Sequence, residues 1–116
     1  MKDDRIYLIH IGECITYIEN FVADGRESFM SSRLIQSAVI WNLQTLAESS
    51  QRISSDIKAA HPEIDWRRMA GLRNILVHDY FGIDLELVWQ IIEQNLPDLK
   101  LQVAAILREF EGEGNQ

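Results

Sequence analysis

Residues 66–82 read WRRMAGLRNILVHDYFG, and this stretch shapes the interpretation of the whole chain. Its apolar residues recur at three- and four-residue steps, which is the spacing of an amphipathic helix. Asp65, directly before it, is a candidate N-cap, and Phe81-Gly82 at its end is a helix break. We therefore expect a helix that runs from Trp66 to about His78.

The same stretch carries three side chains suited to phosphate chemistry, Arg73, His78 and Tyr80. Histidine exchanges a proton near neutral pH, and the planar guanidinium of arginine matches phosphate oxygens. With His78 as general acid or base and Arg73 stabilising the charged transition state, the pattern favours RNA cleavage by internal attack of the 2′-hydroxyl. Asn74 would position a hydroxyl or phosphate oxygen. Tyr80 would bind substrate or be modified.

The spacing of Arg73 and His78 leaves several arrangements open. Five residues on an ideal helix correspond to a rotation of about 140°, so the two side chains do not share one face. They meet if the helix ends at His78 and the chain turns back, or if the same segment of a second copy lies opposite. The plainer alternative is an exposed ion-pairing arginine near a capping histidine.

The rest of the chain also has a helical pattern, with two prolines and few glycines before the tail. Gly25 is a candidate left-handed C-cap, and His61-Pro62 ends the second helix because a residue before proline avoids helical angles. We expect an all-α, antiparallel bundle of four to five helices within residues 1–111, followed by a frayed tail, residues 112–116. The other expected helices are Asp3–Phe21, Phe29 or Ser31 to Lys58, Leu85–Gln94 and Leu99–Phe110.

The C-terminal third contains two boundary signals. Asp84 is a candidate N-cap, and Asn95 with Pro97 marks a break between the last two expected helices. Large apolar residues occur on more than one face of these helices, so a single copy would leave an apolar strip exposed. We therefore expect a homodimer, with a self-sufficient monomer as the alternative.

Composition narrows the function classes. The 116 residues suit one domain, 47% of them are apolar, and the net charge is −7. This acidic balance argues against broad, sequence-independent binding to nucleic acid, but it leaves room for a small basic cleft. No apolar run is long enough to span a bilayer, so we expect no membrane partner. The single cysteine, Cys14, suits a reducing cytoplasm, and the scattered histidines predict neither a metal site nor a cofactor.

The segment His61–Asp84, continued by Val88-Trp89 and Leu96-Pro97, resembles the HepT-like (DUF86) branch of the HEPN superfamily. The shared pattern is hPeipW, aglRN, vHgYfgvd, vW and lP in that order. In this family the arrangement Arg-x4-His-x-Tyr, here Arg73, His78 and Tyr80, is assigned to metal-independent RNase activity. The resemblance implies a HEPN-like helical homodimer that is the toxin of a bacterial HepT/MNT toxin–antitoxin pair.

The resemblance also implies a protein partner. That partner is a minimal nucleotidyltransferase antitoxin, which transfers AMP from ATP to the motif tyrosine, here Tyr80. An added phosphate and adenine beside Arg73 would exclude substrate phosphate by charge and by volume. The alternative is a non-catalytic helical binding module that recruits such a nucleotidyltransferase or is modified by it.

Two positions depart from the family pattern. Ala47-Glu48-Ser49 stands where the family often has Gly-Glu-Ala, and the retained Glu48 would face the cleft and orient Arg73. Asp79 stands where glycine is common. A carboxylate there would favour the protonated form of His78, and it would repel RNA phosphate.

Overall fold

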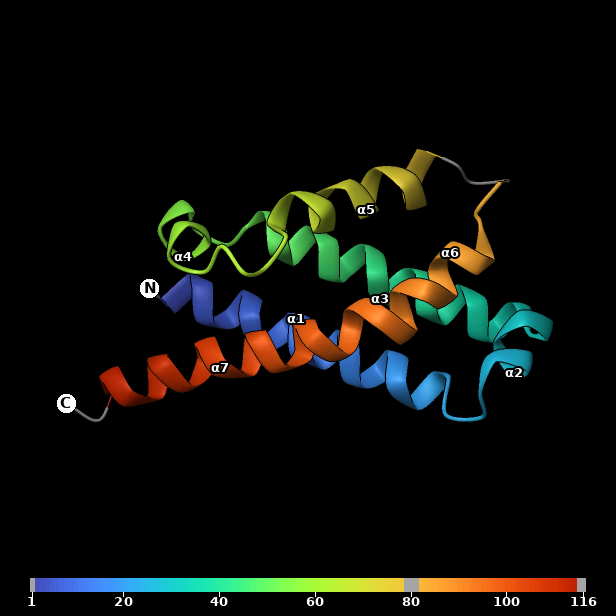
Figure 1. The fold of residues 1–116 in the computed structure, drawn as a ribbon, viewed down its shortest axis with the longest axis horizontal. Coiled ribbons are helices and arrows are strands. Elements are labelled where there is room, and N and C mark those ends of the chain that lie inside the picture. Colours follow the sequence, from blue (N-terminus) through green and yellow to red (C-terminus); the bar gives the residue numbers. More distant parts are fainter. Residues whose placement is uncertain (1, 79–81, 115–116) are drawn as a thin grey trace.

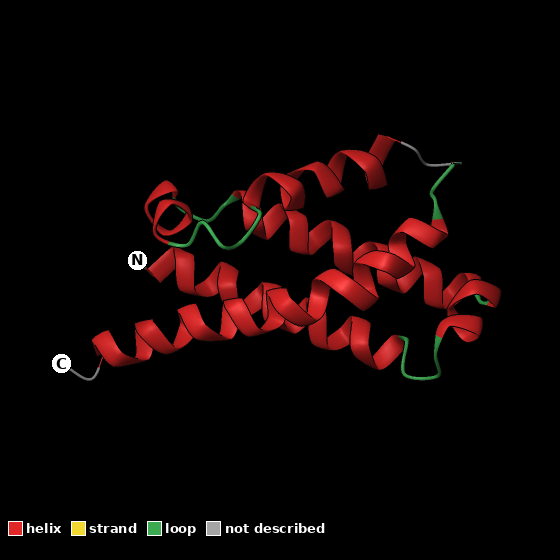
Figure 2. Ribbon diagram, in the orientation of Figure 1, coloured by secondary structure: helices red, strands yellow, loops and turns green. Residues whose placement is uncertain are grey.

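The computed structural model describes residues 2–78 and 82–114, and every regular element in these ranges is a helix (Figures 1 and 2). None of the helices within them is long and apolar enough to cross a membrane. The elements are α1 (Lys2–Phe21), α2 (Arg26–Ser31), α3 (Arg33–Gln51), α4 (Ser55–Ala60), α5 (Trp66–His78), α6 (Leu85–Gln90), the π-helix η1 (Ile91–Asn95) and α7 (Leu96–Gly114).

Helices α1, α3 and α7 build the centre of the molecule, and α5 packs on α3 (Figure 1). Apolar residues at helical spacing face inward from each of these helices, and fully burying one such side chain contributes about 1.5–3 kcal/mol. The fold therefore rests on α1 and α3, which pack side by side along their length. The most deeply buried side chains are Leu8, Ile11, Ile15, Ile18, Phe29, Val39, Leu43, Leu46, Val103 and Ile106.

The long second helix expected from the sequence is wrong, because serine caps divide it into three. Ser32 has extended backbone angles, and its hydroxyl accepts a hydrogen bond from Ile35 N. Ser54 caps α4 in the same way. The buried carboxylate of Asp4 accepts from both the amide and the hydroxyl of Ser54, at 2.7 and 2.8 Å. Serine favours such caps over helix interiors, so α1 helps to fix where α4 begins.

The boundary expected at Asn95 and Pro97 is also wrong, because the chain stays helical from α6 through η1 into α7. Pro97 has no amide hydrogen to donate to a carbonyl in the preceding turn. The wider π-helical turn just before it provides room for the proline ring without ending the helix. The two predicted N-caps are confirmed. Asp65 and Asp84 accept hydrogen bonds from the backbone amides of Arg68 and Leu87, at the starts of α5 and α6.

Two predicted end points need adjustment. Gly25 does have a positive φ, 97°, which favours glycine, but it precedes α2 as its N-cap rather than closing α1 directly. Helix α7 continues to Gly114, three residues past the predicted end of the domain at residue 111. The predicted helix Trp66–His78 matches α5.

Candidate active site

Arg73 lies on α5, and two side chains of α3 hold its guanidinium. Nη2 lies 3.7 Å from Glu48 Oε1, and Nη1 donates to Gln51 Oε1 at 3.3 Å. Glu48 and Gln51 are three residues apart on α3, so one face of that helix presents both acceptors. The packing of α5 on α3 therefore sets the direction of the arginine.

This ion pair is exposed to solvent. The side chain of Arg73 is 46% exposed and that of Glu48 is 50% exposed. An exposed pair of this kind adds only about 0–1 kcal/mol to stability. Its main consequence is geometric, because it restricts a long flexible side chain while leaving part of the guanidinium open to an incoming anion.

The other predicted site residues are only partly described. Asn74 and His78 belong to α5, and His78 is its last described residue. Tyr80 lies outside the described residues. Glu48 and Arg73 are thus the predicted residues that the structure brings together. The catalytic and modification roles assigned to this set stay predictions.

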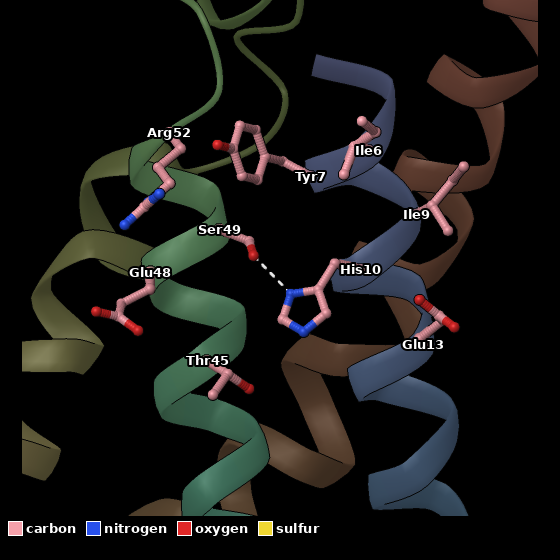
Figure 3. Close-up of a pocket in the computed structure, with 9 residues that line it drawn as sticks. All are labelled: Ile6, Tyr7, Ile9, His10, Glu13, Thr45, Glu48, Ser49 and Arg52. Atoms are coloured by element: carbon pink, nitrogen blue, oxygen red, sulfur yellow. Dashed lines mark hydrogen bonds between the residues drawn. The ribbon is translucent and has the colours of Figure 1, made fainter. Parts of the chain in front are cut away.

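A cleft of ≈ 500 Å³ opens beside Glu48, between α1 and α3 (Figure 3). The ring of His10 points into the gap between the two helices, with Glu48 on one side and Glu13 on the other (Figure 3). We call this the polar cleft. Its lining residues are Ile6, Tyr7, Ile9, His10, Glu13, Thr45, Glu48, Ser49 and Arg52.

A chain of paired polar side chains forms the floor of the polar cleft. Thr45 donates its hydroxyl hydrogen to the carbonyl of Asn42 at 3.2 Å, and its oxygen lies 3.4 Å from the Cys14 sulfur. The same sulfur lies 3.6 Å from Nε2 of His10. Nδ1 of His10 pairs with the Ser49 hydroxyl, 2.6 Å away. The four side chains therefore form one connected hydrogen-bond network.

Two ionisable groups of the cleft are tuned by their surroundings. Burial raises the pKa of the Cys14 thiol, which outweighs the lowering effect of its hydrogen bond to Thr45. The thiol is therefore a neutral floor residue and not a nucleophile. At one end of the cleft the Arg52 guanidinium lies 5.9 Å from the centre of the Tyr7 ring. A hydrogen bond with Tyr7 raises the pKa of Arg52, which keeps its charge in place.

Residues 11–106 match the protein family described as Ribonuclease HepT-like. The chain belongs to the HepT-like family. The matching region covers the second half of α1, all of α3 and α5, and the two residues of the Glu48–Arg73 pair.

Individual relatives agree with this assignment. This HepT-like chain is 41% identical over 100 residues to the probable ribonuclease HepT of Thermococcus cleftensis, covering 85% of this chain and 91% of that one. It is 34% identical over 115 residues to a Methanocaldococcus jannaschii protein named as a gamma-glutamylcyclotransferase and candidate RNase. That match includes 98% of this HepT-like chain but only 52% of the longer protein.

A solved structure confirms the fold. The structure of a tri-AMPylated Shewanella oneidensis HEPN toxin in complex with an MNT antitoxin matches with a TM-score of 0.68 and 27% identity, over 91% of this chain and 98% of that chain. The predicted all-α, HEPN-like bundle is therefore correct.

Sequence reasoning missed the polar cleft of this HepT-like protein. It treated His10 as one of the scattered histidines and Cys14 only as a single thiol. Cys14 is buried and joins the hydrogen-bond network of the cleft floor. The available signal was a pair of four-residue steps, from His10 to Cys14 and from Thr45 to Ser49, because each step places two polar side chains on one helix face. Nothing in the sequence indicated that the two faces meet.

Proposed function

We propose that this HepT-like chain is a metal-independent endoribonuclease, the toxin of a toxin–antitoxin pair. The observation that carries the proposal is the placement of Arg73. It stands on the same helix as His78, and Glu48 and Gln51 of α3 fix its direction while its side chain stays half exposed. Family membership supports assigning these residues to RNA cleavage.

The proposed reaction is an internal transesterification. The RNA 2′-oxygen attacks the adjacent phosphorus, the bond from phosphorus to the 5′-oxygen breaks, and a 2′,3′-cyclic phosphate forms. His78 removes the proton from the 2′-hydroxyl, and the leaving 5′-oxygen takes a proton from water, whose hydroxide is then neutralised by the proton held on His78. Arg73 neutralises the extra charge on the pentacoordinate phosphate. Asn74, next to it on α5, positions a substrate oxygen.

A second copy of the chain completes the proposal. The register of α1 against α3, set by the pairs His10–Ser49 and Cys14–Thr45, brings Tyr17 level with Trp41. Tyr17, Phe21, Leu34 and Trp41 are 56, 42, 81 and 65% exposed, and we call them the apolar patch. Leu34, Trp41 and Glu48 follow one another at seven-residue steps, so the patch and the Glu48–Arg73 pair share one face of α3. A dimer through this patch would bring two motifs together.

A nucleotidyltransferase is the proposed regulatory partner. The matching Shewanella toxin is AMPylated and bound to an MNT antitoxin, which supports the same relation here. Tyr80, two residues after His78, is the proposed acceptor. Its hydroxyl would attack the α-phosphorus of ATP and release pyrophosphate, and the bound AMP would then compete with RNA for Arg73. Co-expression with the partner should add one or more AMP masses, and Tyr80→Phe should remove them.

The test of the proposed function is cleavage of RNA by purified protein in EDTA. Arg73→Ala should lower the rate by about 10²–10³, because it removes a group that stabilises transition-state charge. Arg67→Ala is the matched control, since Arg67 is an exposed arginine on the same helix. The proposal is wrong if folded wild-type protein leaves RNA intact, or if both variants cleave as the wild type does.

A second candidate function is a non-catalytic module that only recruits the nucleotidyltransferase. The net charge of −7 favours it, because RNA phosphate is repelled by an acidic protein. It predicts a modified tyrosine on co-expression and no effect of the free protein on RNA.

A further inference from the structure

The polar cleft has no role in the reaction described above, although Glu48 connects it to Arg73. Glu48 belongs to both places, because it lines the cleft and also contacts the Arg73 guanidinium. Any chain of nucleotides with a phosphate at Arg73 would therefore pass the mouth of the cleft. The volume of ≈ 500 Å³ lies within the usual range for small-ligand sites.

The walls of the cleft are suited to a flat ring. Ile6 and Ile9 present apolar surface from α1, and both are exposed, at 62 and 40%. Tyr7 adds an aromatic ring with the Arg52 guanidinium above it. Flat bases stack on aromatic rings and guanidinium planes, and each stacked base contributes about 1–3 kcal/mol.

The polar groups of the cleft floor already have partners, and the two carboxylates at its edges only accept hydrogen bonds. Ser49 pairs with Nδ1 of His10, and Thr45 donates to the Asn42 carbonyl. Nε2 of His10 pairs with the Cys14 sulfur. Glu13 and Glu48 lie on opposite sides of the His10 ring and are carboxylates (Figure 3). A ligand that contacts either carboxylate must bring a hydrogen-bond donor of its own.

We infer that the polar cleft is a base-binding subsite for RNA, selective for guanine. Among the RNA bases, guanine alone presents two neighbouring donors, N1–H and the 2-amino group, on its Watson–Crick edge, and these match the two oxygens of one carboxylate. Arg52 at one end of the cleft and Arg73 beside Glu48 would then face the phosphates on either side of this base. The inference rests on the proposed function, because it names the sequence at which the RNase would bind its substrate.

Glu13 is the residue that tests this subsite. It lines the cleft, is exposed, and lies on the opposite side of His10 from Glu48, so its replacement leaves the Arg73 pair intact. Glu13→Gln removes one carboxylate from the cleft. Glu27→Gln on α2 is the matched control, because it makes the same charge change at an exposed position outside the cleft.

The experiment uses short 2′-O-methyl RNA oligonucleotides, which resist internal cleavage, with guanosine or inosine at one position. Inosine lacks the 2-amino group. Wild type and Glu27→Gln should bind the guanosine oligonucleotide about tenfold more tightly than the inosine oligonucleotide, as expected for one lost hydrogen bond to a charged acceptor. In Glu13→Gln the ratio of the two dissociation constants should fall close to one. A cleavable version should show the same pattern in kcat/KM.

The possible failures separate the two claims. If wild-type protein cleaves RNA but does not distinguish guanosine from inosine, the base subsite is wrong and the RNase function stands. The subsite is equally wrong if no oligonucleotide binds. It is also wrong if Glu27→Gln lowers the preference for guanosine over inosine as much as Glu13→Gln does. If binding shows a guanine preference that depends on Glu13 while no RNA is cleaved, the subsite is supported and the proposed catalysis fails.

Discussion

The face that α1 and α3 share has two halves of opposite character. In one half, the polar cleft, the side chains of Ser49, His10, Cys14 and Thr45 form one connected hydrogen-bond network. In the other half, the apolar patch, Leu34 and Trp41 are 81 and 65% exposed. The same two helices therefore offer, at one end, a cleft whose preorganised polar floor lies beside the exposed Ile6 and Ile9 and, at the other end, an uncovered apolar surface.

This difference assigns separate tasks to the two halves. A fixed hydrogen-bond network is costly to rearrange, so the polar cleft suits a small ligand that adapts to it. Large exposed apolar side chains near one another are typical of surfaces that another protein covers. The Glu48–Arg73 pair lies on the polar half, on the same face of α3 as the patch. Changes in the patch should therefore act through assembly, and changes in the cleft should act on RNA.

The largest effect is expected in the apolar patch. Trp41→Glu should raise the dimer dissociation constant about a hundredfold or more, because buried interface tryptophans typically contribute about 2–4 kcal/mol. Sedimentation velocity at micromolar concentration would measure it. Leu101→Glu on α7 is the control, since Leu101 is 69% exposed on another helix. If both variants, or neither of them, dissociate, the patch is not the dimer interface.

The next effect concerns the Glu48–Arg73 pair. Glu48→Gln should lower kcat/KM for RNA about tenfold, because Arg73 loses its charged anchor, while the melting temperature stays nearly unchanged. Glu19→Gln is the control, because it breaks a comparably exposed ion pair in which Lys100 Nζ lies 2.8 Å from Glu19 Oε1. This variant should leave the cleavage rate unchanged. An equal loss of activity in both variants would show that Glu48 has no special positioning role.

A smaller effect on stability is expected from the hydrogen-bond chain. Ser49→Ala removes the hydroxyl that pairs with His10 Nδ1 at a buried position and should lower the free energy of unfolding by about 1–2 kcal/mol in urea titrations. Ser31→Ala removes a hydroxyl that bonds only to carbonyls of its own exposed turn, so it should cost much less. Equal losses would contradict the preorganised floor of the cleft.

The smallest effect is a pH dependence from Cys14. Burial raises the pKa of this thiol in the folded protein, so above the ordinary thiol pKa, about 8.5, the unfolded chain releases its proton first. The unfolded state then binds fewer protons, and stability must fall as the pH rises through this region. The free energy of unfolding of wild type should therefore drop relative to that of Cys14→Ala between pH 8 and pH 10. A constant difference would mean that burial does not perturb the thiol.

Much of the fold could be predicted from local chemistry. The helix Trp66–His78 and the caps Asp65 and Asp84 follow from short-range signals, and the structure has each of them. The division of the long helix at Ser54 could not be foreseen in the same way. It depends on the carboxylate of Asp4, fifty residues away in the chain, which only the packed structure brings to Ser54.

The site also has a part that local sequence predicts and a part that it does not. The contiguous motif from Arg73 to Tyr80 could be recognised as a string of residues. Glu48 was expected to orient Arg73, and the structure has the two side chains in contact. The polar cleft could not be recognised, because its polar residues come from α1 and α3 in equal measure and become a site only when His10 meets Ser49. The roles of Asn74, His78 and Tyr80 remain predictions for experiment.

The central claim is that this HepT-like chain cleaves RNA by internal attack of the 2′-hydroxyl. The most direct measurement is mass spectrometry of the ends produced when purified, antitoxin-free protein acts on a defined RNA in EDTA. Internal attack yields 2′,3′-cyclic phosphate and 5′-hydroxyl ends, and both should be lost in His78→Ala. Intact RNA in the presence of folded dimer, or ends bearing a 5′-phosphate, would contradict it.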